Sequence, residues 1–166
     1  TNHAYWNLGG PTEDDIGRHT VMLPADTVVP IDDATLPAAP PEPVDGTPFD
    51  LREPVALSDR LGFSLPNGFD HCFMIAGAGL RRHAPVGHPS GRTLEVWSDQ
   101  PAVQLYTGAV LGGGPGADDR RHDPFAGLCL EPQRVPDAPN LEWAPSAVLR
   151  PGERYRHDIQ FHLRWP

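Results

Sequence analysis

The sequence predicts an all-β domain, and three observations support this. Its 166 residues include 17 glycines and 21 prolines, which interrupt the chain too often for long helices. Residues 154–166 alternate between apolar and polar side chains, the period of a strand with one buried face. No repeat, heptad or convincing amphipathic helix is visible. We therefore expect one domain of β-sheets joined by long, irregular loops.

The strands are expected at five places along the chain. Residues 17–32 read as two short strands broken at Pro24, and residues 71–78 as a short buried strand. Residues 93–99 and 102–111 follow as a pair joined by a turn. In the closing segment the predicted buried face consists of alternate residues: Tyr155, His157, Ile159, Phe161, Leu163 and Trp165.

The intervening runs are expected to be loops. Residues 36–50 carry too many prolines for a helix or a central strand. Residues 111–124 are rich in glycine and then in charge, which is typical of a surface loop. No Lys-Ser/Thr pair follows these glycines, so a phosphate cradle is poorly supported. His83 and His88 are five apart in a Pro/Gly-containing stretch, which we interpret as a loop unsuited to zinc.

Charge and composition exclude several classes of function. The net charge of −9 disfavours nucleic acid, because binding phosphates needs a basic patch. The densest basic run, Arg120 to His122, is flanked by aspartates and reads as a solvated loop. No stretch approaches the roughly 20 apolar residues that span a membrane. Cys72 and Cys129 lie in apolar runs and form no disulfide framework or metal knuckle.

Three stretches combine residue types suited to acid–base chemistry: TNHAYWNL (1–8), NGFDHCF (67–73) and GLCLEPQRVPDAPN (127–140). Each has an ordinary structural explanation: His3 as an exposed terminal residue, Asp70 as a turn former, Glu131 where a strand reaches the surface. Together they suggest more. A carboxylate beside apolar residues has a raised pKa, and with an imidazole across a pocket it forms a general base and acid. A further Asp can accept hydrogen bonds from a neutral polyol. No activated nucleophile is evident.

These stretches resemble the aldose 1-epimerase (galactose mutarotase) family. The family signature runs close to TNHxYFNL, GTPFDFR, G(Y/F)DHxF, VQFYTG and CLE(T/P)Q…PD(S/A)PN. This chain has TNHAYWNL, GTPFDLR, GFDHCF, VQLYTG and CLEPQRVPDAPN in the same order, and closes on the similar VLRPGERYRHDIQFHL. The resemblance covers essentially the whole chain. Departures are Trp6 and Leu51, each in place of Phe, and AAPPEP in place of a Thr-Gly-Glu type loop.

The resemblance implies an all-β fold of the galactose-mutarotase β-sandwich (supersandwich) type and an incomplete portion of it. Residues 1–166 would be the C-terminal part of one domain whose N-terminal half is absent. The implied reaction interconverts the α and β anomers of a free hexose without a metal or other cofactor. Glu131 would be the general base and His3 the general acid, while Asp70 and Gln104 would contact the sugar. Tyr5 and Trp6, which could fix the imidazole of His3 or face the sugar, are expected to pack in the core.

Two alternatives stay open: a sugar-binding module that has lost turnover, and an epimerase of a phosphorylated hexose. The presence of both His3 and Glu131 favours an active enzyme over the first, and the lack of clustered Arg or Lys argues against the second. The implied partners are galactose or glucose and either the missing N-terminal half or a second copy in a homodimer; the expected location is cytoplasmic. The family's sugar-site Arg and second His come from that other half, and neither Arg18 nor Arg52 lies in a matching context.

Overall fold

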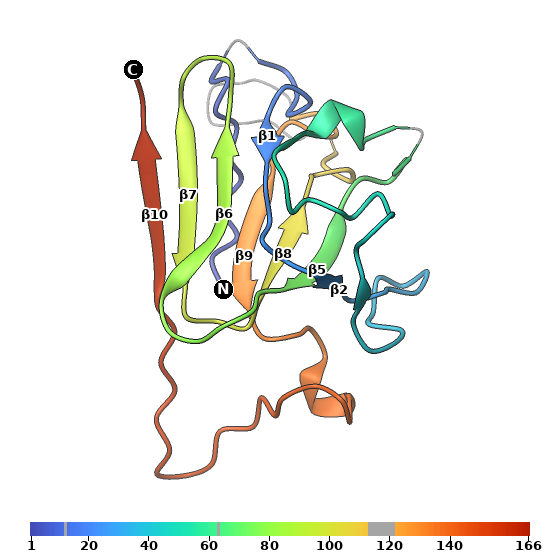
Figure 1. The fold of residues 1–166 in the computed structure, drawn as a ribbon, viewed down its shortest axis with the longest axis vertical. Helices are drawn as coiled ribbons and strands as arrows, with labels where there is room; N and C mark the ends of the chain where they lie inside the picture. The colour runs from blue at the N-terminus through green and yellow to red at the C-terminus, as the bar shows by residue number, and fades with distance from the viewer. Residues whose placement is uncertain (12, 63, 113–121) are drawn as a thin grey trace.

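The fold is all-β, as the sequence predicts, and consists of two five-stranded antiparallel sheets (Figure 1). It is seen in a computed structural model that describes residues 1–11, 13–62, 64–112 and 122–166. The helical elements in this part of the chain are two short 3-10 turns, η1 (Leu57–Asp59) and η2 (Ala138–Asn140). None of the described helices is long and apolar enough to cross a membrane.

The first sheet has the strand order β10-β7-β6-β1-β4. Its members, in that order, are Ile159–Arg164, Thr93–Ser98, Arg81–Gly87, Thr20–Val21 and Val55–Ala56. The hairpin of β6 and β7 forms its centre, and β10 lies along the outer side of β7 (Figure 1). The strand β10 is therefore an edge of the sheet.

The second sheet has the order β3-β2-β5-β8-β9. Its members are Glu42–Pro43, Thr27–Val28, Asp70–Met74, Ala102–Tyr106 and Cys129–Gln133. Residues 17–32 contribute to both sheets, because the chain leaves β1 at Val21 and enters β2 at Thr27. The predicted break at Pro24 is thus where the chain crosses from one sheet to the other.

The core lies between the sheets and follows from strand alternation. Leu94 and Val96 of β7 and Phe73 of β5 are fully buried in one cluster. Val103 and Leu105 of β8 reach the same cluster from the second sheet. Because successive side chains of a strand point to opposite faces, the residues between them face outward. On the second sheet these outward residues carry the chemistry described below.

Most predicted strands are confirmed, with shorter bounds. Residues 71–78 and 93–99 become β5 and β7, and the run at 102–111 ends as a strand at Tyr106. The proline-rich run at 36–50 yields β3, two residues at a sheet edge, which agrees with its exclusion from a central strand. The predicted glycine-rich loop at 111–124 falls mostly on residues 113–121, outside the described residues, and so does most of the basic run from Arg120.

The loop prediction around His83 is wrong, because residues 81–87 form the central strand β6. Pro85 obscured the pattern. It is tolerated here because β1 pairs with Val86 and Gly87 and ends at Val21, so little of the ladder beside Pro85 needs its missing N–H. His83 is fully buried and lies at the register shift between Arg82 and Ala84.

The closing strand confirms its position but only part of its predicted face. Ile159 and Phe161 pack against the core, as expected. Tyr155, Leu163 and Trp165 are 51%, 44% and 73% exposed. The alternation located the strand but predicted it too long: β10 spans Ile159–Arg164, so Tyr155 and Trp165 lie outside it, and Leu163 lies near the end of this edge strand, outside the core cluster.

Candidate active site

The outward face of the second sheet gathers three predicted site residues on three neighbouring strands. In the strand register Gln104 of β8 lies opposite Glu131 of β9, and Tyr106 lies opposite both Asp70 of β5 and Cys129 of β9. The amide of Gln104 donates from Nε2 to Oδ1 of Asp70 over 2.7 Å. Residues two apart share a face of a strand, so Asp70, Gln104 and Glu131 face the same side.

The amino-terminal segment brings His3 to the same place. Trp6 and Leu128 exchange backbone hydrogen bonds of 2.8 and 3.0 Å as an antiparallel bridge. Continuing that register by three residues sets His3 opposite Glu131. The side chains meet there: Nε2 of His3 lies 3.5 Å from Oε1 of Glu131. The amino terminus accordingly runs beside β9 (Figure 1).

The two members of this pair have different environments. The side chain of Glu131 is 8% exposed and that of His3 54%. Burial raises the pKa of Glu131, the charge of Asp70 raises it further, and His3 opposes both effects. A carboxylate with a raised pKa is a stronger base once ionised, and an accessible imidazole can exchange its proton with solvent.

Two tyrosines lie beside His3: Tyr5, which the sequence analysis considered, and Tyr106, which it did not. The rings of Tyr5 and Tyr106 lie 5.2 and 6.2 Å from the imidazole, centroid to centroid. Tyr5 is 45% exposed, so the expectation that it packs in the core is wrong. Trp6 does pack, with its ring 5.3 Å from Phe161. The alternation of residues 3 to 6 could have shown that Tyr5 shares the face of His3 and that Trp6 does not.

Cys129 also touches the imidazole: its Sγ lies 3.4 Å from Nδ1 of His3. Burial raises the pKa of this thiol to about 12, so it is protonated at neutral pH and is no nucleophile. His3, Cys129 and Glu131 are the one trio of potential metal ligands found among the described residues, with donor atoms within 4.8 Å of one another. However, Nδ1 faces the thiol and Nε2 the carboxylate, so one cation cannot use both contacts. The arrangement is better suited to moving protons.

A cavity of about 740 Å³ opens beside Asp70. Its polar lining includes Asn67, Tyr106 and the aspartates Asp32 and Asp33 from the loop that follows β2. Among the residues that the structure describes, none that lines it is Lys or Arg. This cavity can therefore accept a ligand with many hydroxyl groups beside Asp70 and Tyr106, and its described lining offers no Lys or Arg to an anionic ligand.

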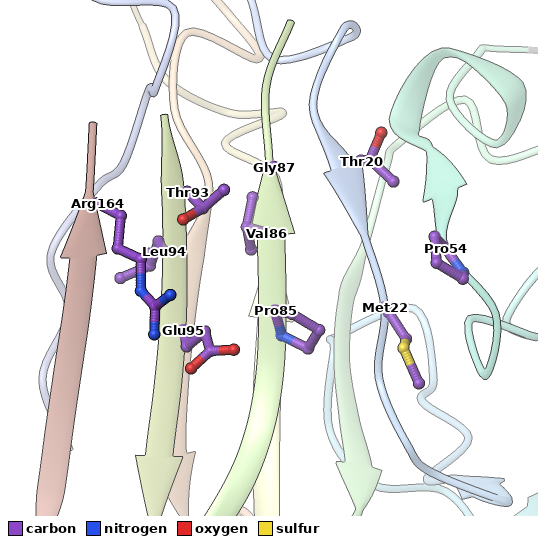
Figure 2. Close-up of a pocket in the computed structure, with 10 residues that line it drawn as sticks. All are labelled: Thr20, Met22, Pro54, Pro85, Val86, Gly87, Thr93, Leu94, Glu95 and Arg164. Carbon is purple, nitrogen blue, oxygen red and sulfur yellow. The ribbon is translucent and has the colours of Figure 1, made fainter. Parts of the chain in front are cut away.

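A second hollow, of about 380 Å³, lies on the other sheet (Figure 2). Its side chains come from β10, β7, β6 and the segments around β1 and β4, and include Met22, Pro85, Glu95 and Arg164. Its lining contains no histidine and only one carboxylate, Glu95. This hollow does not supply an acid and a base together. The surface of the second sheet that carries Glu131 is therefore the better candidate for the active site.

The two arginines considered in the sequence are engaged elsewhere. Arg52 contacts three aspartates, Asp26, Asp45 and Asp50, at 3.6, 2.7 and 2.7 Å. Arg18 lies 3.3 Å from Glu13. The ion pair with Arg52 lowers the pKa of Asp50 to about 2. Neither guanidinium is a contact of the His3–Glu131 pair.

Comparison with known proteins agrees with this geometry. The sequence profile of the aldose 1-epimerase family matches residues 1–162. Human galactose mutarotase is 44% identical over 97% of this chain, and aldose 1-epimerase of Escherichia coli K12 is 34% identical over 93%. The chain spans about half the length of these curated relatives, 48% and 47% respectively.

Solved structures show the same fold. A GalM/aldose epimerase homologue from C. elegans superimposes with a TM-score of 0.90 at 26% identity, covering 99% of this chain and 50% of that one. Galactose 1-epimerase of Lactobacillus acidophilus NCFM, at 23% identity, gives a TM-score of 0.64. With the profile match over nearly its whole length and relatives above 40% identity, this chain belongs to the aldose 1-epimerase family.

Proposed function

We propose that the protein carrying this chain is an aldose 1-epimerase that interconverts the α and β anomers of free hexoses such as galactose and glucose. The observation that carries the proposal is the approach of Nε2 of His3 to within 3.5 Å of Oε1 of Glu131 on a solvent-facing strand surface. Relatives named galactose mutarotase and aldose 1-epimerase support it.

The chemistry requires one proton to leave and one to arrive. Glu131 removes the proton of the C1 hydroxyl, and His3 delivers a proton to the ring oxygen as the bond from C1 to that oxygen breaks. The C1–C2 bond of the open-chain aldehyde rotates, and the ring closes on the other face with the two roles reversed. Both oxygens are attached to C1, so an acid and a base in mutual contact suit them. The reaction changes no oxidation state.

Asp70 and Gln104 are proposed to hold the sugar. Oδ1 of Asp70 is occupied by Gln104, which leaves its second oxygen for a sugar hydroxyl. The amide oxygen of Gln104 is buried and finds no partner among the described residues. A buried acceptor without a donor is costly, and a substrate hydroxyl would satisfy it.

The lining of the cavity beside Asp70 favours neutral hexoses over phosphorylated ones. In the described part of the chain this lining has three aspartates, Asp32, Asp33 and Asp70, and neither Lys nor Arg, whereas phosphate recognition calls for cationic donors. The presence of both His3 and Glu131 favours turnover over a binding module. We further propose that the other half of the family fold completes the site with an Arg and a second His. The cytoplasmic location and the homodimer stay predictions.

Polarimetry on the full-length protein tests this function. Fresh α-galactose or α-glucose should reach its equilibrium rotation much faster with the protein than in buffer, and the hexose 6-phosphates should gain little. Glu131→Gln should remove the acceleration, while Glu142→Gln, the same change at an exposed site, should keep it. Sugar binding without acceleration would identify a binding module, and preference for the phosphate would identify the other alternative; either result would overturn the proposal.

A further inference from the structure

His19 is a buried polar residue outside the acid–base pair. It lies close in sequence to residues 1–8, the segment that carries His3 and is called the His3 segment below. It is fully buried immediately before β1. The backbone N–H of Leu8 donates to its Nε2 over 2.7 Å. Its Nδ1 lies 3.1 Å from the carbonyl oxygen of Ile16. Both ring nitrogens are therefore used, one toward each end of the loop that connects the His3 segment to β1.

These partners fix the protonation of the ring. A backbone N–H can only donate, so Nε2 of His19 must carry no proton and must accept. The single proton of the neutral imidazole is then on Nδ1 and is donated to the carbonyl of Ile16. Burial and the neighbouring His88 lower the pKa of His19 to about 4, against the weaker opposite influence of the hydrogen bond to Ile16 and of Glu13 and Asp15. The neutral form that Leu8 requires is thus the form present near neutral pH.

Leu8 is held on its other side as well. Its carbonyl oxygen accepts from Nη1 of Arg92 over 2.9 Å and from Oγ of Ser90 over 3.2 Å. Both donors belong to the turn between β6 and β7. The ring of His88, from the same turn, lies 4.8 Å from that of His19 and accepts the N–H of Ser90 at Nδ1. The backbone of Leu8 is therefore clamped between His19 and the β6–β7 turn.

The clamp at Leu8 affects how the His3 segment is aligned with β9. Trp6 and Leu8 face the core, whereas Tyr5 and His3 face the site. Within residues 1–6, the described structure has one reciprocal backbone link to the sheet, the Trp6–Leu128 bridge. A shift of one residue would turn His3 away from Glu131, because alternate residues occupy opposite faces. Two contacts beyond the bridge oppose that shift: the side chain of Asn7 donates from Nδ2 to the carbonyl oxygen of Ala126 over 3.0 Å, and the backbone of Leu8 is clamped on both sides.

We propose that His19 is a positioning residue that fixes the register of residues 3–8 through the N–H of Leu8 and so holds His3 against Glu131. This inference rests on the proposed function for its kinetic readout, but the position of His3 can be measured without turnover. His19 does not touch the substrate in this account; it acts through the backbone.

Three variants of the full-length protein test the proposal. His19→Leu removes the acceptor, and His19→Gln keeps an acceptor near the place of Nε2. The matched control is His83→Leu, because His83 is equally buried, also has a pKa lowered to about 4, and takes no part in the described hydrogen bonds of Leu8. We expect His19→Leu to lower kcat by about 10²-fold, the scale of a small misplacement of a catalytic group, with little change in KM. His19→Gln should recover most of the kcat lost in His19→Leu, and His83→Leu should keep the wild-type kcat.

Nitrogen NMR of the imidazoles gives a readout that does not need activity. The signals of His3 should move in His19→Leu and stay in place in His83→Leu. In the wild-type protein His19 should carry its proton on Nδ1, and the Leu8 amide should exchange slowly; a proton on Nε2 would overturn the proposal even if His19→Leu fails to fold. A folded His19→Leu with wild-type kcat and unchanged His3 signals would also overturn it. If the wild-type protein shows no mutarotation but the His3 signals still respond to His19, the proposed function fails and the positioning role stands.

Discussion

Replacing Asp70 with Asn tests the sugar-binding assignment with a minimal change of shape. The variant keeps an oxygen for the 2.7 Å hydrogen bond from Gln104, so the local strand surface should persist. It loses the negative charge at the oxygen left for a sugar hydroxyl. A hydrogen bond to a charged group contributes about 1.5–3 kcal/mol, so KM should rise roughly 10- to 150-fold.

The assay is the concentration dependence of mutarotation by the full-length protein, followed by polarimetry. Asp33→Asn is the matched control, because Asp33 lines the same cavity and is exposed, and the substitution changes the charge by the same amount. KM should change much less in this control. Equal KM values for the two variants would refute the reasoning, because the effect would then come from the overall charge of the cavity and not from a contact at Asp70.

Three further results are expected. In polarimetry across pH, kcat/KM should fall on the acid side as Glu131 becomes protonated, at a pH above the ordinary range of a Glu because burial raises its pKa. Asp70→Asn should move this fall to lower pH, because it removes a like charge near Glu131. A pH profile that does not move in this variant would contradict the coupling between the two carboxyl groups. Glu131→Gln should raise the free energy of unfolding at neutral pH, measured in urea. The pKa of Glu131 is raised in the folded state, so ionisation of this side chain lowers stability as the pH rises through that pKa. A less stable variant would contradict the burial argument. Phe73→Ala should cost about 3–5 kcal/mol of unfolding free energy in the same assay and Val148→Ala at most about 0.5 kcal/mol, so equal losses would contradict the placement of the core.

Local patterns in the sequence predicted those parts of the fold that depend on local physics. Alternation identified β10, the turn before residue 102 separated β7 from β8, and Pro24 marked the crossing between sheets. The prediction missed β6, because Pro85 lowers the strand signal of its own segment while the short neighbour β1 makes the proline tolerable. Whether Leu163 is covered depends on the neighbours of β10, and Trp165 is exposed because the strand ends at Arg164; the spacing of these residues determines neither.

In the site, too, local motifs could be predicted from the sequence and contacts between distant residues could not. The motifs brought attention to Glu131 and Asp70, but their approach depends on the register of three strands from distant parts of the chain. The contact between His3 and Glu131 joins residues 128 positions apart through one bridge at Trp6. No sequence motif indicates the hydrogen bond between Leu8 and His19, because a His before a strand is typical of an ordinary core residue.

The central claim is that His3 and Glu131 together interconvert sugar anomers. Its most direct test is proton NMR exchange between the α and β anomeric protons of galactose at equilibrium, with the full-length protein, His3→Asn and Glu131→Gln. The wild-type protein should transfer saturation between the two signals, and each variant should lower the exchange rate by about 10²–10⁴-fold. Wild-type exchange that persists undiminished in either folded variant would contradict the account.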